Sequence, residues 1–333
     1  MTLSINATLP SLAQLPSLFA IQLTEFSAIS VTGLEQSKYL QGQVTCDVNN
    51  SSEQSLHIGA HCDAKGKVFS VFRLINRVSA DAENQASSHL LLQPKATITA
   101  SLTALKKFGV FAKVIIEETT SLNFFALVGE AAASLLRHKF AQVPDSLSPV
   151  IQVGSTTLVY ISGQQARYIL IDDDNKLSAT LTEFSLPIYT QAVWDLLEIH
   201  QGFPLLSATN LAQYVPQMLN LQAINGISFT KGCYLGQETV ARMQYLGKNK
   251  RALFSLTTQL PETLSHEDII EKQLGENWRK AGDMLASYQA DDGQCFIQAV
   301  LSNDVEQHLR IKAHNESTVT IAELPYSITD KIN

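Results

Sequence analysis

The sequence predicts a mixed α+β protein whose C-terminal part is a small β-barrel. Strand-like and helix-like segments interleave up to about residue 245, without the regular alternation that a doubly wound parallel sheet requires. After residue 250 the chain changes to short apolar runs separated by Gly, Asn and Asp, which is typical of a barrel or sandwich. We therefore expect one region over residues 1–245 and a barrel domain over residues 246–333.

The expected elements follow from local patterns. Residues 1–20 contain many Ser, Leu and Pro and are expected to be irregular, and the first strand is expected at 28–31. Thr32 and Glu35 have the spacing of a capping box, which predicts a helix ending near Gly42. The other elements expected before the barrel are strands at 55–60, 68–75, 89–92, 111–117, 124–128, 156–161 and 168–171, and helices at 101–108, 130–140 and 189–201. The barrel strands are expected at 252–256, 282–288, 294–301, 308–311 and 318–321.

Composition narrows the class of protein. A net charge of −7 argues against binding nucleic acid through the overall field, so an RNA contact would need a local basic patch. The best candidate patch is Arg242, Lys248, Lys250 and Arg251. Four cysteines in 333 residues suit a reducing compartment. With no signal-like N-terminus and no spanning apolar run, the expected location is the cytoplasm, away from membranes.

The cysteines also bear on metal binding. Cys46, Cys62, Cys233 and Cys295 form no Cys-x-x-Cys pair, and their wide spacing matches no zinc or iron–sulfur ligand pattern. We therefore expect no metal site.

The segment 231–238 is the most informative part of the chain. Its flanking glycines allow close backbone approach or unusual dihedrals, and a helix is expected to follow from Glu238. A thiol at the start of that helix would have a lowered pKa and raised reactivity. The alternative is that Cys233 is a small buried hydrophobe. The motif residues are Lys231, Gly232, Cys233, Tyr234, Gly236, Gln237 and Glu238.

Other segments carry unusual polar residues. Residues 41–47 are polar just past a helix end, 61–67 form a tight turn with several ionisable side chains, and 215–230 offer amides suited to binding. Trp194, with Glu198 one turn away, could stack a flat heterocycle and bond its edge, or pack in the core.

These segments together resemble the YgfZ proteins, folate-binding relatives of the glycine-cleavage T-protein, an aminomethyltransferase. The resemblance runs from about residue 25 to the C-terminus and rests on 41–47, 61–67, 202–204, 215–220 and 226–242. It implies a T-protein-like fold, with two α+β subdomains and a C-terminal β-barrel around a central opening. It also implies tetrahydrofolate or a related folate in that opening.

The resemblance assigns two aromatic positions to the folate, which here are Phe26 and Trp194. Bacterial relatives can have tryptophan at the first position, and phenylalanine lacks its indole N–H. His200 is a second departure, because the T-protein-like pattern has an acidic residue there. Glu198 is expected to point elsewhere on a regular helix.

The resemblance further implies a supporting role in tRNA modification, notably methylthiolation by a radical iron–sulfur enzyme, in iron–sulfur enzyme maintenance and in the regulation of replication initiation. T-proteins carry an Asp-Asp pair after the glycine turn, whereas residues 66–71 here contain no carboxylate. We therefore expect a non-enzymatic accessory protein whose contact with the tRNA-modifying enzymes is indirect. Two alternatives stay open: a folate-dependent one-carbon enzyme with Cys233 as catalytic nucleophile or acceptor, and a direct tRNA-binding module.

Overall fold

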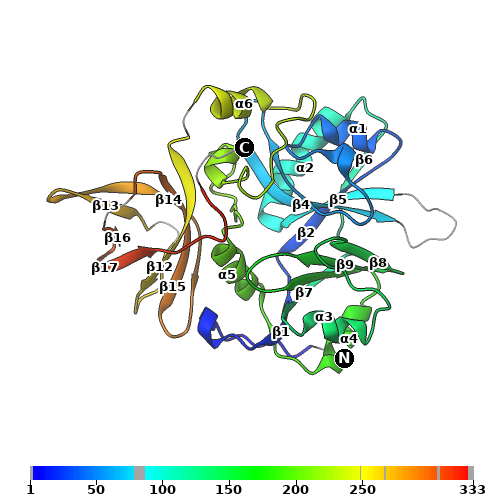
Figure 1. The fold of residues 1–333 in the computed structure, drawn as a ribbon, viewed down its shortest axis with the longest axis horizontal. Coiled ribbons are helices and arrows are strands. Elements are labelled where there is room, and N and C mark those ends of the chain that lie inside the picture. The colour runs from blue at the N-terminus through cyan, green and yellow to red at the C-terminus, as the bar shows by residue number, and fades with distance from the viewer. Residues whose placement is uncertain (1–2, 79–86, 248, 266–267, 306–307, 329–333) are drawn as a thin grey trace.

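The computed structural model describes residues 3–78, 87–247, 249–265, 268–305 and 308–328. Two antiparallel-rich sheets with helices lie on one side of the molecule, and a closed β-barrel lies on the other (Figure 1). Helix α5 (Gln191–Gln201) lies between them. The predicted mixed α+β fold class with a C-terminal barrel is confirmed.

The first sheet has five strands in the order β3-β4-β5-β2-β6. Helix α2 (Lys95–Gly109) packs against it because its apolar residues, among them Ile98 and Leu105, recur on one face. They meet Ile29, Phe72 and Leu74 from the strands. The strands are β2 (Phe26–Thr32), β3 (His57–Cys62), β4 (Val68–Val78), β5 (Ser87–Pro94) and β6 (Ile115–Glu118), and helix α1 (Gln36–Gln41) follows β2.

The second sheet has six strands in the order β11-β1-β7-β10-β9-β8, and only the β1–β11 pair is parallel. Helices α3 (Ala132–Arg137) and α4 (Lys176–Phe184) cover one face, and α5 packs on the other. Because both faces are covered, the middle strands β7 and β10 are buried almost throughout. The strands are β1 (Leu18–Gln22), β7 (Asn123–Gly129), β8 (Val150–Val153), β9 (Thr156–Ile161), β10 (Arg167–Asp172) and β11 (Ile188–Tyr189).

The barrel closes in the order β12-β15-β14-β13-β16-β17 around a core of aliphatic side chains. Leu196 and Ile199 of α5 pack on Tyr288 and Phe296 of the barrel, so α5 joins the barrel to the second sheet. The strands are β12 (Arg251–Gln259), β13 (Ile270–Leu274), β14 (Asn277–Gln289), β15 (Gln294–Ser302), β16 (Leu309–Ile311) and β17 (His314–Ile321). Helix α6 (Gln237–Tyr245) precedes the barrel, and the 3-10 helices are Leu12–Gln14, Val48–Asn50 and Pro216–Leu219.

The structure corrects several expected elements. Strand β1 begins within residues 1–20, the stretch expected to be irregular, and α4 and β13 were not expected. The predicted capping box is wrong, because Thr32 is the last residue of β2 and Glu35 is the N-cap of α1. Helix α2 begins at Lys95, six residues before its expected start, directly after β5 ends at Pro94.

Candidate functional site

The 231–238 segment lies against two other polar segments identified in the sequence. Leu235 N donates to Gly42 O at 3.0 Å, which ties the loop to the end of α1. Thr45 Oγ1 donates to Gly226 O at 2.6 Å, and the Ala60 amide donates to that same hydroxyl at 2.8 Å. These hydrogen bonds join the 41–47, 226 and 235 parts of the chain beside β3, the edge strand of the first sheet.

Lys231 anchors this loop from the inside. Its side chain is buried, and Nζ donates to the carbonyl oxygens of Val44 and Cys46 at 2.8 and 2.6 Å. The ammonium also lies 5.2 Å from the centre of the Tyr234 ring. Burial lowers the pKa of Lys231 to about 8. Lys231 therefore stabilises the loop, and its ammonium group points into the protein rather than toward solvent.

The two glycines of the motif differ. Gly236 has a φ of 83°, and a Cβ there would lie 2.4 Å from Asp63 O and 2.8 Å from Gly66 Cα. Glycine is required because the loop backbone meets the β3–β4 turn directly. Gly232 is exposed, and nothing lies within 4 Å of a Cβ placed on it. The close backbone contact therefore explains why position 236 is glycine, but it does not explain the glycine at position 232.

Cys233 is exposed, whereas Cys46, Cys62 and Cys295 are buried. Helix α6 begins at Gln237 with Gly236 as its N-cap, so the thiol precedes the helix instead of starting it, and that expectation is wrong. Burial raises the pKa of the Cys46 thiol to about 12. Of the four thiols, Cys233 is the one that a partner or reagent can reach.

His61 and Cys62 do not form a nucleophilic or metal-binding pair. Both are fully buried neighbours on β3, so their side chains point to opposite faces of the sheet. His61 Nδ1 shares a 2.9 Å hydrogen bond with Ser101 Oγ on α2, and burial lowers its pKa to about 4. Cys62 packs in the cluster that contains Val240 of α6.

The amides of the 215–230 segment mostly join elements to one another. Gln217 Nε2 donates to Val240 O at 2.6 Å, and the Asn220 side chain bonds both backbone groups of Leu253 on β12. These bonds connect the 215–230 segment to α6 and to the barrel. Ile224 and Asn225 instead line the central cavity described below.

Phe26 and Trp194, the two expected folate residues, lie in contact. Their ring centroids are 6.5 Å apart with the planes at 73°, and both side chains are buried. Trp194 is 1% exposed, so it packs in the core between α5 and the second sheet. No face of its ring is open to solvent in the structure.

Two arginines cover Trp194. The guanidinium carbons of Arg167 and Arg73 lie 4.9 and 5.8 Å from its ring centre, and Arg73 also lies 3.8 Å from the centre of the Phe203 ring. Glu198, one helical turn after Trp194, accepts from Arg167 Nη1 at 2.6 Å and from Arg73 Nη2 at 2.7 and 3.0 Å. All three charged side chains are at most 3% exposed.

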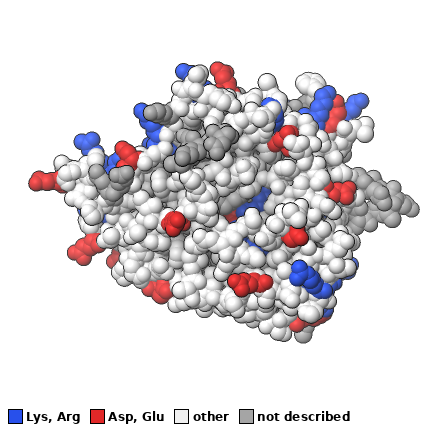
Figure 2. Space-filling model, viewed as in Figure 1, with Lys and Arg blue, Asp and Glu red and all other residues white. Residues whose placement is uncertain are grey.

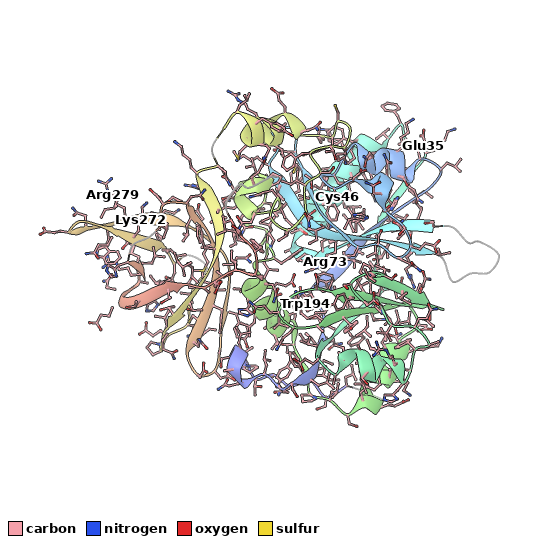
Figure 3. The ribbon with its side chains drawn as sticks, viewed as in Figure 1. Glu35, Cys46, Arg73, Trp194, Lys272 and Arg279 are labelled. Carbon is pink, nitrogen blue, oxygen red and sulfur yellow. The ribbon has the colours of Figure 1, made fainter. Side chains whose placement is uncertain are left out.

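A cavity of about 280 Å³ lies over these arginines, near the middle of the molecule where Figure 3 labels Arg73 and Trp194. Figure 2 shows Lys or Arg atoms at the base of a hollow on this face. The lining residues come from both sheets, from the end of α5 and from the C-terminal segment: Leu56, Ile58, Arg73, Ile161, Ser162, Gly163, Arg167, Gln201, Phe203, Ile224, Asn225, Pro325 and Tyr326.

Glu198 is buried beneath the cavity, where it bonds both arginines, and it does not itself line the cavity. His200 is half-buried and does not line the cavity; burial, and then the charge of Arg167, lower its pKa. Sequence reasoning did not identify Arg73 and Arg167. The available signal was a single arginine inside the otherwise apolar run 71–75.

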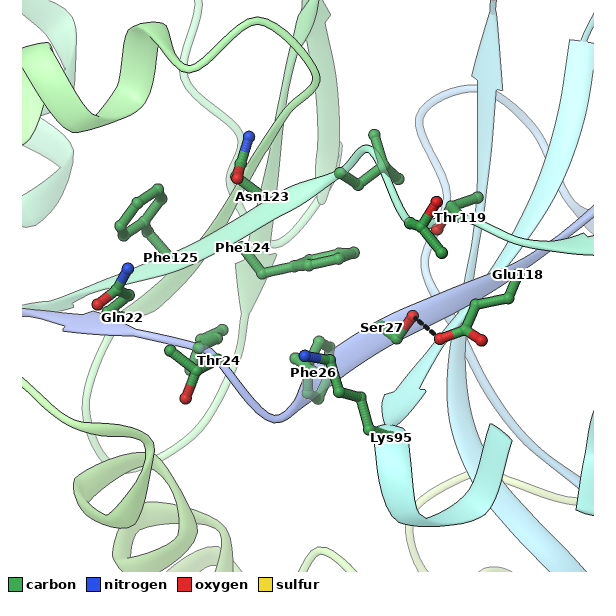
Figure 4. Close-up of a pocket in the computed structure, with 13 residues that line it drawn as sticks. Gln22, Thr24, Phe26, Ser27, Lys95, Glu118, Thr119, Asn123, Phe124 and Phe125 are labelled. Carbon is green, nitrogen blue, oxygen red and sulfur yellow. Dashed lines mark hydrogen bonds between the residues drawn. The ribbon is translucent and has the colours of Figure 1, made fainter. Parts of the chain in front are cut away.

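A second cavity, of about 530 Å³, lies on the other side of the aromatic pair. Phe26 and Phe124 line it together with polar side chains, including Lys95 and Asn123 (Figure 4). Ser27 Oγ donates to Glu118 Oε1 at 2.9 Å across its wall. Phe26 therefore faces a different cavity from the one that the arginines line.

The structure describes three of the four residues of the candidate basic patch. Arg251 lies 3.6 Å from Asp283, and Lys248 lies outside the described residues. Arg242 belongs to α6, and Lys250 is exposed just before β12. In the described part of the chain, no group of three or more His, Cys, Asp or Glu side chains is arranged to hold a metal ion. No helix within the described ranges is long and apolar enough to cross a membrane.

The fold of this chain is similar to that of a protein of known structure. A structure of glycine cleavage system aminomethyltransferase T from Bartonella henselae is similar, with a TM-score of 0.69 over 93% of this chain and 86% of that chain. The sequence identity is 13%, so this likeness shows a shared fold alone.

Sequence relatives are much closer. A family model described as "YgfZ, beta-barrel domain" matches residues 249–316. A protein of Yersinia enterocolitica, named tRNA-modifying protein YgfZ, is 38% identical over 96% of this chain and 95% of its own length. A protein of the same name from Colwellia psychrerythraea is 64% identical over 98% of this chain and 99% of its own length. This chain therefore belongs to the YgfZ family.

Proposed function

We propose that this chain is a folate-binding accessory protein that supports tRNA modification, including methylthiolation by iron–sulfur enzymes, without catalysing a folate reaction. The observation that carries the role in tRNA modification is the 64% identity, over almost its whole length, to a protein named for it. The T-protein-like fold supports a folate ligand, because the family resemblance implies folate in the central opening of that fold.

The residues of the central cavity fit part of a folate. Phe203, Ile58 and Ile161 offer apolar wall for a flat ring, and Gln201 and Asn225 offer amides that can donate and accept. Arg167 Nε is buried with no hydrogen-bond partner among the described residues. An acceptor brought by a ligand would satisfy such a donor. Apolar ring surface and hydrogen-bonding edge groups are what a folate presents.

The 66–71 stretch supports an accessory role over a transferase. Ser70 and Val71 are buried in β4, and Val71 packs in the cluster with Phe203 and Val240. Where a T-protein carries its carboxylates, this chain thus has core side chains that cannot move a proton to or from a bound folate. The chain's own residues bind and orient the ligand.

The proposal predicts binding without turnover. Isothermal titration of the purified chain with tetrahydrofolate should give one site, and the folate should be recovered unchanged after incubation with glycine-cleavage partner proteins. Conversion of the folate would contradict the accessory role. Absence of binding by any reduced folate would contradict the ligand.

The exposure of Cys233 favours one alternative, a one-carbon enzyme that uses this thiol as nucleophile or acceptor. It predicts that the Cys233 thiol adds to the methylene carbon of methylenetetrahydrofolate while one C–N bond of the bridge opens and its nitrogen takes the proton, giving an adduct detected by intact mass and peptide mapping. Cys233→Ser should abolish the adduct. If the thiol stays unmodified and alkylates at an ordinary slow rate, this alternative is wrong.

A further inference from the structure

The wall of the central cavity carries an excess of buried positive charge. Arg73 and Arg167 share one carboxylate, Glu198, and all three side chains are at most 3% exposed. Among the described residues that line the cavity there is no carboxylate. Burial, and then the like charge of Arg73, act to lower the pKa of Arg167 against the effect of Glu198. Two guanidinium groups with one counter-ion leave a buried charge of about +1.

The two guanidinium planes are held in place. Arg73 lies against the Phe203 ring at 3.8 Å, Arg167 lies 4.9 Å from the centre of the Trp194 ring, and Glu198 fixes one end of each fork. Glu198 engages Nη2 of Arg73 and Nη1 of Arg167, while Arg167 Nε has no partner in the described structure. Fixed planar donors suit a planar carboxylate better than a mobile surface charge would.

The remaining lining favours an organic anion over a bare inorganic one. Leu56, Ile58, Ile161 and Ile224 add aliphatic surface beside the arginines. A hydrated inorganic ion gains nothing from such walls, whereas the body of an organic acid buries apolar surface against them.

We propose that Arg73 and Arg167 form a carboxylate-binding site in the central cavity, and that the glutamate end of the folate occupies it. The identity of the ligand rests on the proposed function, whereas the carboxylate site itself rests on the buried charge. A cavity of about 280 Å³ is at the small end of ligand pockets, so one end of a folate enters it. The arginines select the negatively charged end.

Calorimetric titration with three fragments separates the two ends of the ligand. The probes are p-aminobenzoyl-glutamate, its uncharged diamide, and pterin, each titrated into the full chain. The charged fragment should bind at least tenfold more tightly than the diamide, and raising the salt concentration should weaken the charged fragment alone. Equal affinity of the charged fragment and the diamide would overturn the carboxylate site.

Variants assign the effect to the arginines. Arg167→Met should weaken the charged fragment at least tenfold and leave the diamide unchanged. Arg77→Met is the matched control, since Arg77 lies on β4 with Arg73 but pairs with Asp173 outside the cavity lining, and it should bind like the wild type. Unchanged binding of the charged fragment by a folded Arg167→Met protein would overturn the proposal.

A second variant covers the case in which Arg167→Met does not fold. Glu198→Gln keeps the side-chain size and removes the competing carboxylate, so the charged fragment should bind at least as tightly as in the wild type. Weaker binding in folded Glu198→Gln protein would contradict the site.

The failures of the two proposals are distinguishable. If tetrahydrofolate binds the wild type and pterin competes with it while p-aminobenzoyl-glutamate does not, the folate proposal stands and the carboxylate site is wrong. If p-aminobenzoyl-glutamate binds in an Arg167-dependent way and no reduced folate binds, the site stands and the folate assignment is wrong.

Discussion

Lys231 shows how a single motif residue differs from its appearance in the sequence. Beside an exposed cysteine, a lysine suggests a surface charge that activates a thiol. In the structure its ammonium group instead bonds the backbone carbonyls of Val44 and Cys46, inside the joint between the loop and the first sheet. Lys231 is therefore structural, and Cys233 is left as the exposed nucleophile of the motif.

The buried ammonium should give Lys231 a measurable effect on the pH dependence of stability. Its pKa is about 8 in the folded chain and near 10.5 when unfolded, so between these values the unfolded state binds more protons and stability rises with pH. From pH 8 to pH 10, the free energy of unfolding of the wild type should rise by about 2 kcal/mol relative to that of Lys231→Met, as measured by urea denaturation. A difference that stays constant over this range would show that the ammonium is not desolvated.

The role of Trp194 in ligand binding is better tested by substitution with phenylalanine than with alanine. Because the side chain is 1% exposed, Trp194→Ala should cost about 3–5 kcal/mol of stability and obscure any effect on the ligand. Trp194→Phe keeps an aromatic ring under Arg167 and Arg73 but offers them a weaker cation–π surface. Folate binding should weaken by about 1 kcal/mol, measured by calorimetry.

The barrel supplies a control for this change. Trp278 on β14 makes the same kind of contact with Arg310, at 4.1 Å, and does not line the central cavity. Trp278→Phe should leave folate affinity unchanged. Equal loss of affinity in both variants would mean that the effect of Trp194 is a general loss of stability.

At the scale of elements, the contact between the 231–236 loop and the β3–β4 turn holds the motif in place. A Cβ on Gly236 would overlap the backbone of Asp63 and Gly66, and the φ of 83° is itself unfavourable for other residues. Gly236→Ala should therefore lower the free energy of unfolding by about 2 kcal/mol, measured by chemical denaturation.

Gly232 provides a matched control four residues away. A Cβ there meets nothing within 4 Å, so Gly232→Ala should change stability by less than about 0.5 kcal/mol. If the two variants lose equal stability, the close approach at Gly236 does not limit the fold.

Most elements could be predicted from the sequence because their signals are local. Alternating or continuous apolar runs gave β9, β10 and β15 within one residue of their observed ends. Strand β1 was missed because only its pairing with β7 and β11 explains its pattern. The capping-box prediction failed for a related reason: pairing with β5 and β6 keeps Thr32 in β2, and this tertiary contact overrides the local helix signal.

The candidate site was predicted only in part, because its parts meet through tertiary contacts. The exposed thiol and the neighbouring polar segments were found from residue types and a family motif. The arginine pair was not, since Arg73 and Arg167 stand 94 residues apart on different sheets and meet only in the folded chain, at Trp194 and Glu198 of α5. Sequence periodicity describes one element at a time and carries no information on such pairing.

At the scale of the whole molecule, both sheets contribute residues to the central cavity, and α5 joins the second sheet to the barrel. Its outer face meets the barrel through Leu196 and Ile199, and its inner face meets the second sheet through Val193 and Leu197. We propose that residues 246–333 form a separate barrel domain and that 1–245 form the folate-binding region. Ligand binding then depends on how α5 is held between these parts.

We also propose that this support of tRNA modification needs the exposed Cys233. The most direct test is the fraction of methylthiolated tRNA, measured by mass spectrometry, in a strain that lacks its own family member and expresses this chain. The wild-type chain and the loop control Thr230→Ala should restore modification, while Cys233→Ala should keep its fold and folate affinity but restore little. Full restoration by Cys233→Ala would contradict the role of the thiol, and no restoration by the wild-type chain would contradict the proposed function.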